Sequence, residues 1–151
     1  MVVLRLLLAA LHLLALGIGF GAVWARGRAL ARATDADHLR PAFYADVWWG
    51  IAALVWISTG LARLFGPFEK GTDYYFDNPL FDAKMGLLGL ILVLEVWPMR
   101  TLIRWRVQLG KGQPVDLAPA RRFATISFVQ AALVVAMVLC AVAMARGYGV
   151  G

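Results

Sequence analysis

The sequence predicts an all-α integral membrane protein, a bundle of four helices with its N- and C-termini outside. Hydrophobic residues make up 62% of the 151 residues, whereas soluble domains are nearer one half apolar. Four apolar segments, each near the length that a helix needs to cross a bilayer, alternate with polar loops. We therefore expect one transmembrane domain over residues 1–151, with helices at about 2–24, 41–65, 79–105 and 119–146.

The first segment carries the most informative residue of the chain, His12. An ionisable side chain inside a membrane span is expensive, so it is a functional-site candidate by default. The segment is long, and Arg26, Arg28 and Arg32 follow it. This pattern is typical of a retained helix rather than of a cleaved signal peptide.

Prolines and one asparagine predict where the other helices begin and end. Pro41 can occupy the first turn of the second helix, and Asn78 can cap the third with Pro79 in its first turn. Pro98 removes a helical hydrogen bond, so we expect it to kink or break the third helix. Pro119 is expected in the first turn of the fourth helix.

Loop charges predict the orientation of the chain. Basic residues gather in the first and third loops, whereas the second loop is mainly acidic. Loops rich in Lys and Arg stay in the cytoplasm. Both termini are therefore expected on the outer side of the membrane. The net charge of +6 follows from this topology, so we expect no nucleic-acid partner.

Cysteine and histidine usage restricts the metal sites that the chain can form. Cys140 is the single cysteine, so no CxxC motif or intrachain disulfide exists, and haem cannot be attached covalently. One intramembrane histidine cannot build a zinc or copper site alone. The other histidine, His38, lies in the first loop and is expected to be solvated.

Tryptophans near the helix ends give a scale for depth in the membrane. Counting at 1.5 Å per residue from the inner tryptophans places one polar or sulfur-containing residue of each helix about 18–20 Å above that level. Helical spacing also gathers the unusual residues of each helix on one face. The sequence therefore predicts a shared polar interior, with one level formed by His12, Thr59, Lys84 and Met137.

Three roles are open for His12: a hydrogen-bonded residue without a ligand, an axial ligand to haem iron, or a participant in proton or metal-ion movement. Lys84 either extends to the outer interface or points inward as a catalytic residue or a partner of an acidic group. Together with Arg5 and Arg63 it would hold carboxylates such as haem propionates. Met137 would approach the opposite face of such a ligand.

Glu95 and Asp46 lie near the inner ends of their helices. Pairing with Arg26, Arg28 or Arg100 is one explanation for them. The alternative is that Glu95 acts as a catalytic proton donor.

Most of the chain resembles an uncharacterised family of small four-helix bacterial inner-membrane proteins. The resemblance is carried by LHLLALGIGFGAVWARGRAL, FYADVWWGIAALVWISTGLARLFGPFEKGTDYYF and FDAKMGLLGLILVLEVWPM. It implies four membrane spans and assigns no activity.

The chain also distantly resembles HemJ-type protoporphyrinogen oxidases and CopD-like membrane domains. HemJ proteins have a Leu-His pair in the first helix and a lysine early in the third, which Leu11, His12 and Lys84 match. The Asn- and Pro-containing pattern of their fourth helix is absent, and ATISFVQAALVV stands there. The metal-binding His and Met pairs of CopD proteins are not evident. This resemblance implies bound haem b and, more distantly, oxidation of a porphyrinogen.

The leading hypothesis is therefore a haem b or porphyrin-binding redox protein of the inner membrane, with His12 as the metal ligand. Two alternatives come from other classes. One is a non-catalytic accessory subunit of a larger membrane complex, and the other is a small proton or metal-ion transporter that uses His12, Lys84 and Glu95. The expected partners are the lipid bilayer and either a second copy or a larger complex.

Overall fold

The computed structural model describes residues 2–66 and 77–149, and this part of the chain is helical without a strand. The long helices are α1 (Val2–Arg32), α2 (Arg40–Phe65), α4 (Pro79–Gly110) and α5 (Ala120–Ala145), and a short 3-10 helix, η1 (Asp37–Leu39), precedes α2. Four helices in the described residues are long and apolar enough to cross a membrane. The predicted all-α, four-helix class is therefore confirmed.

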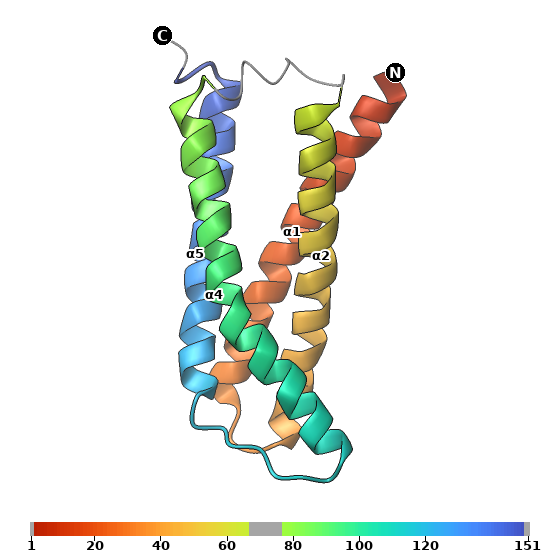
Figure 1. The fold of residues 1–151 in the computed structure, drawn as a ribbon, viewed down its shortest axis with the longest axis vertical. Helices are drawn as coiled ribbons and strands as arrows, with labels where there is room; N and C mark the ends of the chain where they lie inside the picture. Colours follow the sequence, from red (N-terminus) through yellow and green to blue (C-terminus); the bar gives the residue numbers. More distant parts are fainter. Residues whose placement is uncertain (1, 67–76, 150–151) are drawn as a thin grey trace.

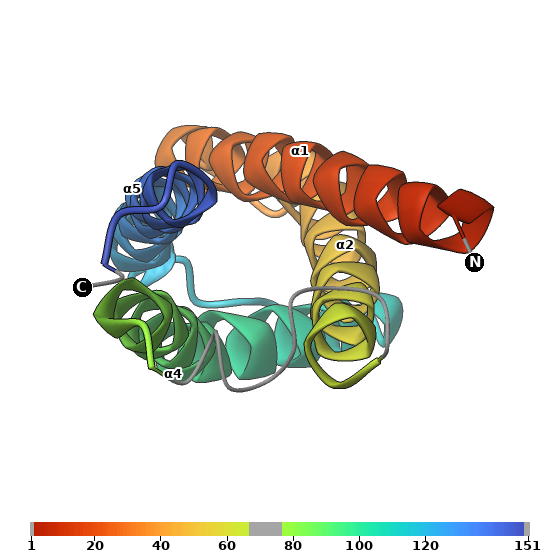
Figure 2. The same cartoon turned by 90° about the horizontal axis from the view of Figure 1, so that it is seen from above.

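The helices form two pairs, α1 with α2 and α4 with α5, which diverge toward one end of the bundle (Figure 1). At that end α1 begins and α5 ends, and we call it the terminal end. The connections from α1 to α2 and from α4 to α5 lie at the opposite end, called here the loop end. Seen from above, the four helices surround a common centre (Figure 2).

Large apolar side chains cover the outside of every helix. They include Leu14 on α1, Leu54 on α2, Val93 on α4 and Leu139 on α5, each with more than 60% of its surface exposed. In water such a surface would cause aggregation, whereas in a bilayer it contacts acyl chains. Buried polar residues occur on all four long helices, among them Arg26, Thr59, Thr101 and Gln130.

Helix starts follow the predicted signals. The Asn78 side chain accepts a hydrogen bond from the Leu80 backbone N–H at 2.9 Å, and Pro79 occupies the first turn of α4. A proline also lies in the first turn of α2. Pro119 is the residue before α5 rather than part of its first turn. These residues fix the helix starts because they satisfy or remove backbone N–H groups that have no helical partner.

Two boundaries differ from the prediction. α1 continues beyond Trp24 to Arg32, because nothing after Trp24 breaks a helix, and Arg26 is therefore a bundle residue rather than a loop residue. α4 continues through Pro98 to Gly110, so of the two expected outcomes, a kink or a break, the helix does not break. Pro98 is buried, and α4 bends near its middle (Figure 1). Packing of the following turn preserves the helix despite the lost hydrogen bond.

The first loop is closed by local hydrogen bonds. The Asp35 carboxylate accepts bonds from the backbone N–H groups of Asp37 and His38, and its Oδ1 lies 2.7 Å from Nδ1 of His38. The hydrogen bond to the His38 side chain is the main reason why the pKa of Asp35 lies below its ordinary value. His38 is exposed, as expected from the sequence.

Two apolar clusters fill the interior. The middle cluster joins all four helices and contains Val23, Trp49, Ile91 and Val134 among its buried members. The second cluster closes the loop end. Its buried members include Leu30, Leu39, Leu102, Trp105 and Phe123. The middle cluster separates the two polar regions described next.

Candidate functional site

A cavity of about 520 Å³ lies between the diverging helix pairs, on the terminal side of the middle cluster. Residues of all four helices line it, and most of these residues are apolar. His12, Arg63, Lys84 and Met137 are among them. The structure thus brings together four of the residues that the sequence predicted to hold a ligand. Arg5 lies outside the lining and is exposed on α1.

Both ring nitrogens of His12 are hydrogen-bonded to α2. The Trp56 indole Nε1–H donates to Nε2 of His12 at 2.9 Å, and Nδ1 lies 2.9 Å from the Thr59 hydroxyl. An indole nitrogen can only donate, so Nε2 carries a lone pair. The Thr59 hydroxyl donates its own proton to a backbone carbonyl, at 2.7 Å from that of Val55 and 3.0 Å from that of Trp56. Nδ1 must therefore carry the proton of a neutral imidazole.

This pattern makes a prediction about the tautomer. At neutral pH, nitrogen-15 NMR of the protein in micelles should show His12 as the Nδ1–H tautomer, with Nε2 unprotonated. Exposed His38 is the only other histidine of the sequence, so two sets of imidazole signals are expected. A protonated Nε2 at His12 would contradict the assignment.

Gly60 brings α2 close to the imidazole. A Cβ atom added at Gly60 would lie 3.3 Å from Cε1 of His12, which is closer than ordinary van der Waals contact. Glycine therefore allows the ring to lie beside α2 within reach of Trp56 and Thr59. Arg63 lies nearly one turn further along the same helix and is half-buried.

The cations of the site are not isolated charges. Arg5, Arg63 and Lys84 each take part in an interaction, so none is without a partner. Arg63 and Lys84 both line the cavity and come from different helices, α2 and α4 respectively. An acidic ligand in the cavity would compete with their present partners for these cations.

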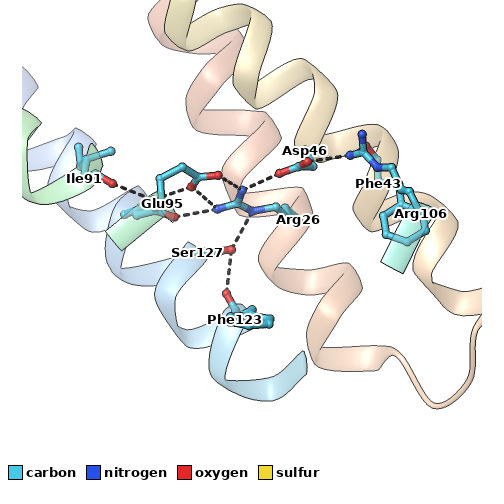
Figure 3. A network of polar contacts seen from close by, with 9 residues as sticks. Arg26, Phe43, Asp46, Ile91, Glu95, Arg106, Phe123 and Ser127 are labelled. Carbon is cyan, nitrogen blue, oxygen red and sulfur yellow. Dashed lines mark hydrogen bonds and ion pairs between the residues drawn. The ribbon is translucent and has the colours of Figure 1, made fainter. Parts of the chain in front are cut away.

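A second polar region lies on the other side of the middle cluster and is centred on Arg26 (Figure 3). The Arg26 side chain is completely buried. Its Nη1 bonds Asp46 of α2 at 2.8 Å and Glu95 of α4 at 2.7 Å, and its Nη2 bonds Glu95 and the Gln130 side-chain oxygen of α5, each at 2.8 Å. Nε donates to the Ser127 hydroxyl at 3.0 Å. All five N–H donors of the guanidinium therefore have acceptors.

The partners of Arg26 are themselves bonded. The Gln130 amide donates to Glu95 at 2.8 Å and to the Ile91 carbonyl at 3.1 Å, and the Ser127 hydroxyl donates to the Phe123 carbonyl at 2.9 Å. A second arginine, Arg106, bonds the free oxygen of Asp46 at 2.7 Å. Two arginines and two carboxylates thus balance in charge, which is what a buried ionic cluster requires.

Glu95 and the cavity are separate. Glu95 is not among the cavity-lining residues, and about 16 Å of helix lies between it and Lys84. On each helix, buried members of the middle cluster lie between the cavity residue and the residue of the Arg26 network. The predicted pairing of Glu95 and Asp46 with Arg26 is confirmed, whereas Arg28 and Arg100 are exposed. No described contact joins Glu95 to His12.

Sequence reasoning missed the roles of two residues. Trp56 is the partner of Nε2 of His12, and Arg106 is a partner of Asp46, and the sequence predicted neither contact. The sequence does indicate that Arg26 belongs to the first helix, since no proline separates it from the apolar run of that helix. No comparable signal exists for Arg106, whose position depends on α4 continuing past Pro98.

A metal held by several side chains is not supported in the described part of the chain. Among residues 2–66 and 77–149, no group of three or more His, Cys, Asp or Glu side chains is placed to hold an ion. A metal at His12 would have to arrive with ligands of its own, as iron does in a porphyrin.

Comparison with known proteins agrees with the fold. No curated protein and no solved structure matches the chain. The model of a family described as "Predicted membrane protein (DUF2214)" matches residues 4–149. Together with the four apolar helices, this match shows that the chain belongs to the DUF2214 family of membrane proteins.

Proposed function

We propose that this protein binds haem b or a related porphyrin in the terminal-end cavity and serves a redox function in the bacterial inner membrane. The observation that carries the proposal is the state of His12, a neutral imidazole beside a cavity with its Nδ1–H already held by Thr59. Histidines that bind metals generally donate their second ring N–H to an acceptor in this way.

The donor set of the cavity fits the group. The volume of about 520 Å³ is within the range of small-molecule and cofactor sites, and the lining is mainly apolar, as a porphyrin face requires. Arg63 and Lys84 supply cations suited to carboxylate side arms. The Trp56 N–H competes directly with iron, because it now holds the Nε2 lone pair that iron would take.

Each of these residues would have a distinct role in binding. His12 would hold the iron, Thr59 would keep the imidazole in the correct tautomer, and Met137 would pack against the bound group from α5. Haem supplies one-electron chemistry when bound. If the bound group is instead a porphyrinogen substrate, its oxidation would pass electrons to a quinone or another membrane carrier, and Lys84 is the candidate catalytic residue. Glu95 has no part in this proposal.

An absorption spectrum of the purified protein, saturated with haemin and freed of excess, tests the proposal. We expect a Soret band in the wild type, loss of the band in His12→Ala, and an unchanged band in His38→Ala. A wild type without the band, or a band that persists in His12→Ala, would remove haem ligation by His12.

A glycine pair on α2 gives a finer test. Gly60→Ala places a Cβ atom against His12 and should weaken haem binding, whereas Gly50 has no atom within 4 Å of an added Cβ. We expect Gly60→Ala to lower the affinity by about tenfold, the equivalent of ~1.4 kcal/mol. Gly50→Ala should leave it unchanged. Equal affinities would show that the imidazole does not need its position beside α2.

The accessory-subunit hypothesis remains as a second candidate because large apolar side chains are exposed on all four long helices. Stoichiometric co-purification of a larger membrane protein, with no Soret band in either, would favour it over haem binding. The transporter hypothesis gains no support from the packed apolar layer between the cavity and Glu95.

A further inference from the structure

Three arginines and a tryptophan form an exposed basic surface at the loop end of the α4–α5 pair. Trp97, Arg100 and Arg104 recur at intervals of three and seven residues, so they share one side of α4. Arg122, in the first turn of α5, places its guanidinium carbon 5.3 Å from the centroid of the Trp97 ring. All four residues are exposed. We call them the Trp97 surface.

The Trp97 ring has a fixed position. It packs edge-on against the fully buried Phe123, with 5.6 Å between the ring centroids. The Arg122 guanidinium of α5 also lies over the Trp97 ring. A cation–π interaction of this kind is worth about 0.5–1 kcal/mol at an exposed site. The surface is therefore held across two helices rather than formed by independent side chains.

In the part of the chain that the structure describes, no carboxylate pairs with the charges of this surface. Among the described residues, Arg100, Arg104 and Arg122 form no ion pair, whereas Arg26 and Arg106 are both paired with carboxylates. Planar guanidinium groups match the oxygens of a phosphate, often with two parallel hydrogen bonds. The chemistry of the surface therefore fits a phosphate group.

Apolar side chains continue the same side of α4 toward the membrane centre. Val93 and Leu90 are exposed one and two turns before the tryptophan, with 70% and 45% of their surfaces uncovered. A ligand that fits the whole surface has a phosphate at the loop end and an acyl chain along α4. We propose that the Trp97 surface binds the headgroup of an anionic phospholipid, such as phosphatidylglycerol.

Native mass spectrometry of the full chain in micelles can test this proposal, by titration with phosphatidylglycerol and separately with phosphatidylcholine. We expect preferential retention of phosphatidylglycerol by the wild type. The triple variant Arg100→Gln/Arg104→Gln/Arg122→Gln should lose at least about tenfold in affinity, because three charge-assisted contacts disappear together. The single variant Arg122→Gln should show a smaller loss in the same direction.

The matched control removes the same charge from the same end of the bundle. Arg28, Arg32 and Arg40 are also exposed, and Arg28→Gln/Arg32→Gln/Arg40→Gln should retain phosphatidylglycerol within about twofold of the wild type. Equal losses in both triple variants would show a general surface charge and overturn the site. Displacement of the lipid by millimolar inorganic phosphate would also overturn it, because the acyl chain would then contribute nothing.

Discussion

Replacing Arg26 by methionine is expected to lower the free energy of unfolding by about 3–5 kcal/mol, the cost of leaving a buried charge without its partner. In this variant Glu95 keeps only the Gln130 amide as a side-chain donor, while Asp46 keeps Arg106. Titration with sodium dodecyl sulfate in mixed micelles, followed by tryptophan fluorescence, measures the loss.

Arg28→Met is the matched control for this prediction. It removes the same group from the same helix at an exposed position, so its effect should stay within about 0.5 kcal/mol. If Arg26→Met were as stable as this control, the network would contribute nothing to folding.

A double variant distinguishes the stability lost with the ion pair itself from the cost of leaving one buried charge unpaired. Arg26→Met/Glu95→Met removes both members of the bidentate pair, and Asp46 remains paired with Arg106. Replacing a buried pair by apolar side chains is often neutral, so the double variant should recover more than half of the loss. A double variant less stable than Arg26→Met would indicate that Glu95 stabilises the bundle through Gln130 instead.

Gly27→Ala is the second change for which we expect a large effect. An added Cβ atom would lie 2.8 Å from Cε1 and 3.0 Å from Cδ1 of the Phe128 ring, closer than real contacts allow. That ring is also held by Trp24, with 5.0 Å between the centroids, so it has little room to turn. Overpacking of this kind costs about 1–3 kcal/mol, measured by the same titration.

Gly21 on the same helix gives the control for this change. No atom lies within 4 Å of a Cβ atom added at Gly21, so Gly21→Ala should be neutral or slightly stabilising. The additional substitution Phe128→Leu should restore part of the stability of Gly27→Ala. Equal stability of the two alanine variants would mean that α1 and α5 do not approach closely at Gly27.

The fold was predictable from the sequence because a membrane span is identified by the mean hydropathy of a segment of about 20 residues, not by single residues. Apolar length and flanking charges determine that four helices exist, and local signals such as Asn78 determine where α4 starts. Depth counting succeeded for His12 and Thr59, which are hydrogen-bonded to each other, because helical rise is nearly constant.

The polar interactions were only partly predictable because they depend on where helices end and bend. Arg26 was recognised as a charge, but its five donors find acceptors only because α1 continues to Arg32. Arg106 reaches Asp46 only because α4 continues through Pro98. The partner of Nε2 of His12 depends on the rotation of α2 about its own axis, which helical periodicity gives only coarsely.

The position of Arg26 also constrains the order of biosynthesis. Its acceptors come from α2, α4 and α5, and Ser127 and Gln130 belong to α5, which is made after the other three helices. Until α5 enters the bilayer, the guanidinium of α1 lacks part of its hydrogen bonds. A ribosome-bound or truncated chain should therefore remain loosely assembled and open to membrane proteases until α5 has been inserted.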